Sequence, residues 1–469
     1  MNLLDEHNKK VDIIVSQLKS YHKSKENKKI RFTHGSTNST RVQDKSNFHL
    51  IDISSLNQVI KIDNVKNIAM VEPNLPMDKL VTLCLQKGLL PKVVMEFPGI
   101  TCGGGINGAA LEASSFKFGQ FNDTCVEYEV VLGSGEVRTV NRKKQADLFY
   151  GISGSYGSIA LLTLITLELI PARPYVKVSF TPAKTDSLID SISSHCRKDY
   201  DFIEAIVFDR EKSLLITGKL SEKRELPLQT FSKAHDEWFY LYAKKQLEKE
   251  TQTSILVPIQ DYLFRYNRGA FWTGKDAFEM FHMPFNRLTR WLLNPFMNTR
   301  TMYKGLHNTN LAQNFFIQDF YIPFSQANKF LNLSMDKLGI FPLWLCPLQS
   351  TQTAQKLSPH YMKENLLLDI GIWGSVNDLK SGIKKINREF EEYIKQVGGR
   401  KMFYANSYYP EEEFWRIYDK KWYTNLRKKY KAEKIFPNIW QKVHTYKEYK
   451  IQKWKILKTL NSRWKCITL

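Results

Sequence analysis

Hydrophobic and polar residues alternate along residues 1–174 in short segments that are typical of strands and of few helices. Residues 12–22 carry apolar side chains at helical spacing, and "MDKLVTLCLQKGLL" (77–90) predicts a second helix. "CVEYEVVLGSGEVRTV" (125–140) predicts a hairpin that turns at Gly133. The other expected strands are "IRFT" (30–33), "FHLIDISSL" (48–56), "NIAMVEP" (67–73) and "SIALLTLITLELIP" (158–171).

Residues 175–399 predict a second α+β unit with strands, helices and a long aromatic and basic segment. Its expected strands are "YVKVSFTPA" (175–183), "FFIQDFYIPF" (315–324), "FPLWLCPL" (341–348) and "LLLDIGIWG" (366–374). Neither unit shows the regular strand–helix alternation of a doubly wound parallel sheet, so the expected fold class is α+β. Residues 400–443 either return to the first unit or close over it, and 444–469 form a basic tail.

The composition describes a folded protein with an excess of positive charge. The 469 residues are 43% hydrophobic and 13% aromatic, which excludes a disordered chain. The net charge of +21 favours anionic partners, or is the charge of a lysine-rich surface. Without a zinc-finger spacing or a basic homeodomain-like helix, we expect neither a metal nor nucleic acid. Six cysteines without a C-x-x-C pair indicate a reduced intracellular chain.

One glycine-rich stretch, "GITCGGGINGAALEASSFKFGQF" (99–121), poses the main question about a cofactor. Residues 103–108 have G-x-G-x-x-G spacing, and Asp123 lies where the ribose-binding acid of a Rossmann site is expected. A Rossmann site needs a strand directly before the first glycine and a helix directly after the third. Here Pro98 interrupts the approach, and only a helix of one or two turns is expected between 108 and 114. A glycine turn or a cradle for another cofactor stays open.

Two further segments surround this stretch. The turn "HGSTNSTR" (34–41) is an ordinary solvated turn or a phosphate cradle, and "DLFYGISGSYG" (147–157) precedes a buried strand. In this order the segments resemble the FAD-binding domain of the vanillyl-alcohol oxidase (PCMH-type) superfamily. The resemblance implies the following FAD-binding residues: Gly35, Ser36, Thr37, Thr101, Cys102, Gly103, Gly104, Gly105, Ile106, Asn107, Gly108, Ser114, Gly119 and Gly157.

Longer matches, from about residue 12 to about residue 443, resemble the Delta(24)-sterol reductase branch of that superfamily. They include "VEPNLPMDKLVTLCLQKGLLPKVV" (71–94), the strands of 175–399, and "FYANSYYPEEEFWRIYD" (403–419). The resemblance implies a two-subdomain FAD-binding domain in 1–174, an α+β substrate or cap domain in 175–399, and a segment 400–443 returning over the flavin. Two features depart from the branch. Asn406 stands where an acid is usual, and the N-terminal membrane segment of the animal members is not found.

The branch implies the reduction of a C=C bond in a sterol or related isoprenoid lipid, with NADPH as donor. The alkene then needs a proton from an acid or from water. Tyr404 and Tyr408 are the candidate acids, or are aromatic packing residues, and Asn406 is a candidate for orienting substrate. Three polar positions on apolar strands either line the substrate slot or hydrogen-bond across strands: Gln318, Asp319 and Asp369.

Two other functions fit the same pattern. The protein is then an FAD-linked oxidase or dehydrogenase of an alcohol or sugar, or a membrane-surface protein in which a degenerate flavin domain serves as a scaffold. His34 precedes Gly35 at a position unlike that of a tethering histidine, so we expect non-covalent FAD. The sequence has no NADPH motif of its own, so this donor rests on the resemblance.

The two ends of the chain bear on its location. The first residues lack an apolar signal core, and the longest apolar run, 158–171, is too short to span a bilayer. We therefore expect an intracellular protein, cytoplasmic or peripheral to a membrane. The ending "CITL" (466–469) fits C-a-a-X, so Cys466 is a candidate for prenylation or a chance match. The basic tail predicts contact with an anionic membrane surface.

Overall fold

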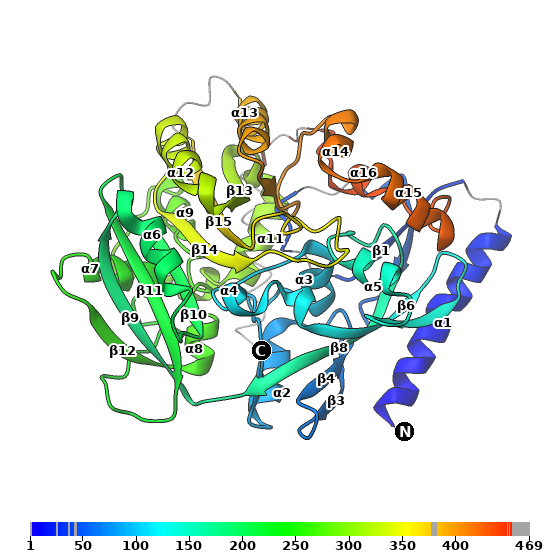
Figure 1. The fold of residues 1–469 in the computed structure, drawn as a ribbon, viewed down its shortest axis with the longest axis horizontal. Helices are drawn as coiled ribbons and strands as arrows, with labels where there is room; N and C mark the ends of the chain where they lie inside the picture. The colour runs from blue at the N-terminus through cyan, green and yellow to red at the C-terminus, as the bar shows by residue number, and fades with distance from the viewer. Residues whose placement is uncertain are drawn as a thin grey trace.

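The computed structural model describes residues 2–24, 27–35, 38–41, 45–376, 382–447, 449 and 451–452. Within these ranges most strands belong to two large antiparallel sheets, one in the first part of the chain and one in the second (Figure 1). This mixed architecture confirms the α+β fold class. Ser36, Thr37, Cys466 and most of the basic tail lie outside the described residues.

The first sheet is built around β8 (Leu161–Pro171), whose leucine and β-branched side chains are almost all buried because neighbours cover both its faces. The order is β3 (Val59–Asp63), β4 (Ile68–Val71), β8, β6 (Cys125–Val131) and β7 (Val137–Asn141), with β5 (Leu89–Pro91) paired to β8. Strands β6 and β7 form the expected hairpin. All the pairs in this sheet are antiparallel, which excludes a doubly wound fold.

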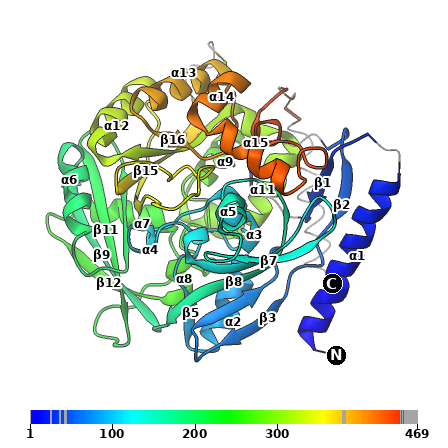
Figure 2. The same ribbon diagram turned by 45° about the vertical axis from the view of Figure 1, so that its right-hand side comes forward.

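Helix α1 (Leu3–Lys23) is longer than the expected 12–22, because Asn2 caps it and acidic residues occupy its first turn. It lies beside the parallel pair β1 (Ile30–Thr33) and β2 (His49–Asp52) (Figure 2). His7 of this helix contacts Glu72 and Glu129, each at 3.0 Å. Burial opposes a charge on His7, but the two carboxylates outweigh it and raise the pKa of His7 to about 9. The imidazolium therefore fastens α1 to the first sheet.

The second sheet has eight strands in the described ranges. Their order is β12 (Thr253–Pro258), β9 (Tyr175–Lys184), β11 (Lys212–Ser221), β10 (Phe202–Val207), β14 (Leu343–Gln349), β15 (Leu366–Ser375), β13 (Phe315–Pro323) and β16 (Arg400–Lys401). Helices α6 (Thr185–His195), α12 (Phe324–Leu338) and α13 (Ile383–Gln396) cover one face and form an apolar core with it. In α13 the buried positions recur at helical spacing. The opposite face of this sheet is therefore available to pack against the first part of the chain.

Short helices complete both parts. The first part contains α2 (Met77–Leu85), α3 (Cys102–Gly108), α4 (Ser115–Phe118), η1 (Phe121–Thr124) and α5 (Ala146–Ile152). The second contains α7 (Phe239–Gln246), α8 (Ile259–Leu263), α9 (Gly274–Met280), α10 (Arg287–Leu292), η2 (Asn294–Phe296), α11 (Thr299–Thr309) and η3 (Leu311–Asn314), and the chain continues through α14 (Glu411–Ile417), α15 (Lys420–Lys429) and α16 (Ile439–Val443). None of the helices in the described ranges has the length and apolar composition needed to cross a bilayer.

The segment after β16 packs against the first part of the chain. The guanidinium of Arg427 on α15 donates to the carbonyl of Ser158 at 2.7 Å, and Lys429 pairs with Asp147 at the same distance. Arg41 donates to the carbonyl of Phe403 at 2.6 Å. These contacts place residues 402–447 across the first part of the chain.

A buried ion cluster joins the two parts. Arg265 donates from Nε to Glu204 on β10 at 2.9 Å and from Nη2 to Glu112, which follows α3, at 2.7 Å. The other oxygen of Glu204 accepts from the Tyr266 hydroxyl and from the Trp344 indole. The side chain of Arg265 is fully buried, so its charge depends on these carboxylates rather than on water.

We expect Arg265→Met to lower the free energy of unfolding by about 3–5 kcal/mol, because it leaves two carboxylates buried without their cation. Urea denaturation followed by tryptophan fluorescence measures the change. Arg210→Met is the matched control, since it removes an exposed ion pair with Asp336 and is expected to cost about 0–1 kcal/mol. Equal losses in the two variants would contradict a central role for Arg265.

Candidate functional site

A cavity of about 840 Å³ is lined by residues of both parts of the chain. Its volume is within the range of sites for cofactors and other small molecules. The lining falls into three groups. These are a glycine-rich and cationic group from the first part, an apolar group mainly from 270–315, and a small set of acids and aromatic side chains around β13 and β15.

The glycine-rich stretch itself folds into the helix α3, whereas residues 109–114 are not helical, so the short helix expected between 108 and 114 is wrong. The Thr101 hydroxyl caps the helix by accepting from the Gly104 amide at 3.2 Å. Two further amides, those of Cys102 and Gly103, donate to the carbonyls of Leu75 and Pro73. This neighbouring loop thus satisfies donors that a helix start would otherwise leave unpaired, and it favours helical structure over the glycines.

Gly103 allows this packing, because a Cβ there would lie 2.7 Å from the Pro73 Cβ. The chain leaves the helix at Ala109 with a left-handed backbone, φ 56°. No long helix follows: α4 begins only at Ser115 and contains four residues. The helix turns one edge toward the cavity, from Thr101 at its amino terminus to Gly108 at its end.

The structure brings only part of the predicted FAD-binding set to the cavity. Residues of this set in the lining are Thr101, Gly103, Gly104, Asn107, Gly108 and Gly157. At Gly108 a Cβ would meet only the Tyr156 hydroxyl, at 3.9 Å, so a side chain there would occupy space that a ligand can use. Beside Gly108, the side chain of Asn107 accepts from the Gly157 amide at 2.8 Å and joins the two glycine segments.

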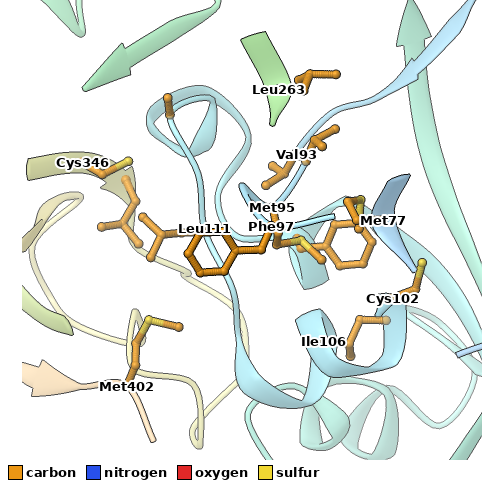
Figure 3. Close-up of a cluster of buried hydrophobic side chains, with 14 of the residues drawn as sticks. Met77, Val93, Met95, Phe97, Cys102, Ile106, Leu111, Leu263, Cys346 and Met402 are labelled. Carbon is orange, nitrogen blue, oxygen red and sulfur yellow. The ribbon is translucent and has the colours of Figure 1, made fainter. Parts of the chain in front are cut away.

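Other predicted cofactor residues lie away from the lining. Cys102 and Ile106 point from α3 into an apolar cluster with Met77 and Met95 (Figure 3). Gly105 is packed against Met95 in the same direction. The remaining three do not line the cavity either: Ser114 donates to the Lys92 carbonyl, Gly119 lies beside Asp123, and Gly35 has a positive φ between its cavity-lining neighbours His34 and Asn38.

Cations surround the glycine edge. Arg31, Arg41 and Lys442 all line the cavity. Arg41 donates to two backbone carbonyls, and Lys442 donates to the Gly157 carbonyl at 3.1 Å. Burial lowers the pKa of Arg41 to about 10. Burial and the charges of Arg31, Arg41 and Arg427 lower the pKa of Lys442 well below its ordinary value.

This group of cations fits the pyrophosphate of FAD. In the described ranges no carboxylate forms an ion pair with Arg41 or Lys442, so an anion would relieve their mutual repulsion. Buried polar atoms without a partner lie in the same lining: His34 Nδ1, Asn74 Oδ1 and the Tyr156 hydroxyl. A polar ligand satisfies such atoms. The residues that could hold FAD are therefore those of the glycine edge, the cations and the side chains with unpaired polar atoms.

The second group of lining residues is apolar. Side chains from 270–315 surround the cavity with little hydrogen-bonding capacity: Phe271, Met280, Met297, Met302, Leu306 and Leu311 are examples. Phe271 packs against Trp373 with ring centroids 4.4 Å apart. Such a lining excludes water and favours an aliphatic or aromatic ligand.

The third group contains two acids whose pKa values are raised by burial. Burial raises the pKa of Asp319 to about 7, although the nearby side chains of Tyr404 and Trp373 lower it. Burial and the charges of Glu112 and Asp319 raise the pKa of Glu96 to about 8. Both line the cavity, and one oxygen of Asp319 has no hydrogen-bond partner. A carboxyl group with a pKa near neutrality can act as a general acid.

Tyr404 and Trp373 position this group. The Trp373 indole donates to the Tyr404 hydroxyl at 2.9 Å, and both side chains line the cavity. Gly371 lies opposite Asp319 in the sheet. A Cβ at Gly371 would lie 2.5 Å from the Trp373 ring and 2.8 Å from Asp319 Oδ1. The glycine therefore makes room for both side chains.

Five other candidates lie outside the lining. Asn406 and Tyr408 are buried, and their backbone groups bond to Gln318 and Glu391 respectively. The Gln318 side chain therefore forms hydrogen bonds in the interior of the second part of the chain. Asp369 is buried next to Asp319 on the same sheet face, and neither oxygen has a partner. Asp123 accepts from His360 and Gln355, so it is not a ribose-binding acid of this cavity.

Sequence reasoning missed Glu96, Arg41 and Lys442. Glu96 stands alone before the glycine stretch, in no recognisable pattern. Arg41 ends the turn 34–41, and its proximity to an expected phosphate cradle was a usable signal. Lys442 is about 400 residues from Arg41 along the chain and belongs to a segment rich in lysine, so only the fold distinguishes it from its neighbours.

Comparisons with known proteins agree with this geometry. The family described as "FAD binding domain" matches residues 17–141. Human Delta(24)-sterol reductase is 27% identical over 412 residues, 87% of this chain and 80% of its own. The Arabidopsis thaliana protein of that name is 27% identical over 431 residues (84% and 76%), and a Caenorhabditis elegans homologue is 25% identical over 422 residues (85% and 79%). The chain therefore has an FAD-binding domain and resembles Delta(24)-sterol reductases over most of its length.

We expect Lys442→Met to weaken FAD binding roughly 10- to 100-fold, because a hydrogen bond to a charged group contributes about 1.5–3 kcal/mol. Titration of the apoprotein with FAD, followed by flavin fluorescence, gives the dissociation constant. Lys434→Met, at an exposed position of the same segment, should leave it unchanged. If both variants bind FAD as the wild type does, Lys442 has no part in the site.

Proposed function

We propose that this FAD-dependent oxidoreductase reduces a carbon–carbon double bond of a sterol or related isoprenoid lipid, with NADPH as electron donor. The observation that carries the proposal is one cavity in which a cationic, glycine-lined part is continuous with an apolar part that contains acids of raised pKa. The relatives named Delta(24)-sterol reductase support the choice of substrate class. NADPH rests on that likeness alone.

In this proposal the groups of lining residues have different roles. Arg41 and Lys442 would bind the anionic pyrophosphate, and the dinucleotide would be held by the lining residues Thr101, Gly103, Gly104, Asn107, Gly108 and Gly157. FAD, when bound, supplies hydride transfer to and from carbon. The apolar lining holds the lipid and keeps water from the reacting carbons. Phe271 and Trp373 lie where the apolar lining meets the acids.

Reduction of a double bond adds a hydride to one carbon and a proton to the other, so the site needs a proton donor. We assign this role to Asp319, which stands on β13, lines the cavity and has one oxygen without a hydrogen-bond partner. Tyr404 is the second candidate. Burial, with the charges of Asp319 and Tyr303, raises its pKa well above the ordinary value, so it keeps its proton. For Asn406 and Tyr408, which do not line the cavity, we propose support of the segment that carries Tyr404.

The other two functions receive less support. Sugar hydroxyls need hydrogen-bond partners that the apolar lining around 270–315 offers sparsely. A scaffold without FAD would have no use for a buried cationic group that an anion stabilises.

The reaction is tested in two steps. We expect NADPH to bleach the absorbance of the bound flavin, and a sterol with a side-chain double bond to restore it under nitrogen. A saturated sterol alcohol is the control and should not restore the colour. Recovery with the alcohol or a sugar derivative only would contradict the proposal, and a colourless protein that takes up no FAD would exclude both enzymatic functions.

Asp319→Asn should slow the sterol-dependent step about 10²- to 10⁴-fold, the usual contribution of a general acid. The bleaching by NADPH should not change, since no proton from Asp319 is needed there. Stopped-flow absorbance separates the two steps. A comparable loss in the NADPH step of the same variant would indicate a structural effect rather than proton donation.

The pH dependence follows from the raised pKa values. The donor must carry its proton, which Asp319 holds below a pKa of about 7. We therefore expect the rate of the sterol-dependent step to fall as the pH rises through about 7, and this dependence to disappear in Asp319→Asn. Glu96→Gln keeps Asp319, so the rate of its sterol-dependent step should still fall as the pH rises through about 7. If the pH dependence of this rate changes only in Glu96→Gln, then Glu96, whose pKa is about 8, is the proton donor in place of Asp319.

A further inference from the structure

We propose that residues 281–292, which include helix α10, rest on an anionic lipid bilayer. The docking surface consists of the apolar side chains Phe281, Met283, Leu288, Trp291 and Leu292 and the cations Arg287 and Arg290. It is separate from the basic tail 444–469, most of which lies outside the described residues. The surface and its partner go beyond the proposed reaction.

The exposure of large apolar side chains here is unusual for a protein surface. Leu288 is 62%, Trp291 50% and Leu292 57% exposed. Helix α10 buries none of its residues. Phe281 and Met283, just before it, are exposed as well. Within the described residues this is the densest group of exposed large apolar side chains.

The arrangement on α10 is that of a helix lying in a membrane interface. Leu288, Trp291 and Leu292 have the spacing i, i+3 and i+4, so they share one face. Arg287 and Arg290 lie three residues apart, on a different side of the helix. Tryptophan favours the interface between lipid headgroups and acyl chains, and arginine reaches from there to phosphate.

The charge of the segment matches anionic lipid. Between Glu279 and Asp319 the sequence has no Asp or Glu, while it has Arg287, Arg290, Arg300 and Lys304. Arg300 pairs with Asp78. In the part of the chain that the structure describes, no carboxylate pairs with Arg287 or Arg290. The guanidinium of Arg290 instead lies 4.9 Å from the centre of the Phe285 ring.

The docking surface is continuous with the cavity. Phe281 and Met283 are exposed and also line it. Met280, Leu293, Phe296 and Met297, from the same segment, line it further. An apolar molecule held in a bilayer could therefore pass between these side chains into the cavity without crossing water. This continuity favours a bilayer over a protein partner, which would cover the entrance and supply no lipid.

Binding is measured on the FAD-loaded full chain without turnover, so its outcome is independent of the proposed reaction. The probe is sedimentation with sucrose-loaded vesicles of phosphatidylcholine, with and without phosphatidylserine. We expect the wild type to sediment with the vesicles that contain phosphatidylserine. We expect Leu288→Asn/Trp291→Asn/Leu292→Asn to lose roughly tenfold or more in partition coefficient, since each buried CH₂ contributes about 0.8 kcal/mol.

The matched control replaces three exposed apolar residues elsewhere: Leu3→Asn/Ile13→Asn/Val65→Asn. It should bind as the wild type does. Retained flavin absorbance and circular dichroism show that each variant is folded. If the α10 variant binds as tightly as the wild type, the membrane contact lies elsewhere, in the basic tail or on another face, and the proposal is wrong. A wild type that binds neither kind of vesicle also overturns it.

The cations are tested separately. Arg287→Gln/Arg290→Gln should bind phosphatidylserine vesicles roughly 30-fold more weakly, since each cation near an anionic surface contributes about 1 kcal/mol. Lys143→Gln/Lys144→Gln removes the same charge from another exposed turn and should change binding far less. Equal losses in the two double variants would show that net charge alone attracts the protein, and would contradict a specific docking surface.

Discussion

The geometry of the cavity depends on one buried cation. Arg265 holds Glu112, which follows the glycine helix, and Glu204, which stands in the second sheet. Taking an arginine out of water is costly unless carboxylates replace the water, so the two parts of the chain can meet here only in a position that keeps both contacts. Burial raises the pKa of Glu112 to about 7, and Arg265 opposes that rise. The same contact thus fixes the glycine edge relative to the apolar and acidic lining.

The acids of the second sheet behave in two ways although they share one face. Glu204 receives hydrogen bonds from Arg265, Tyr266 and Trp344. In the described part of the chain no cation pairs with Asp319 or Asp369, and burial, which is the largest cause in both, raises their pKa values above the usual range. An acid paired with a cation holds structure together, whereas a buried acid without one retains a proton. One face of the sheet therefore carries both an ion cluster that joins the two parts of the chain and two buried acids of raised pKa.

The sequence predicted the strands well and the site only in part. β8, the β6–β7 hairpin and β13 appear where continuous or alternating apolar runs predict them, because burial patterns are local. The short helix expected after Gly108 lies instead over the glycines themselves, since Thr101 and the loop around Pro73 stabilise a helix there through contacts that spacing alone does not show. Lys442 and Glu96 reach the cavity through tertiary packing, which no local pattern encodes. Asp319 was singled out as a polar residue on an apolar strand, but its neutral state comes from burial.

The order of polarity along the cavity lining has a consequence for how ligands enter. Cations and unpaired polar atoms favour the charged dinucleotide, and the apolar lining near 280–297 excludes it, because a phosphate there would lose its hydration without gaining a partner. A lipid has the opposite preference. In the proposed reaction the two ligands therefore would not exchange places, and the apolar entrance would stay open to the lipid while the dinucleotide is held. A surface that both lines this entrance and exposes Leu288 and Trp291 fits a substrate that arrives from a bilayer better than one that arrives from water.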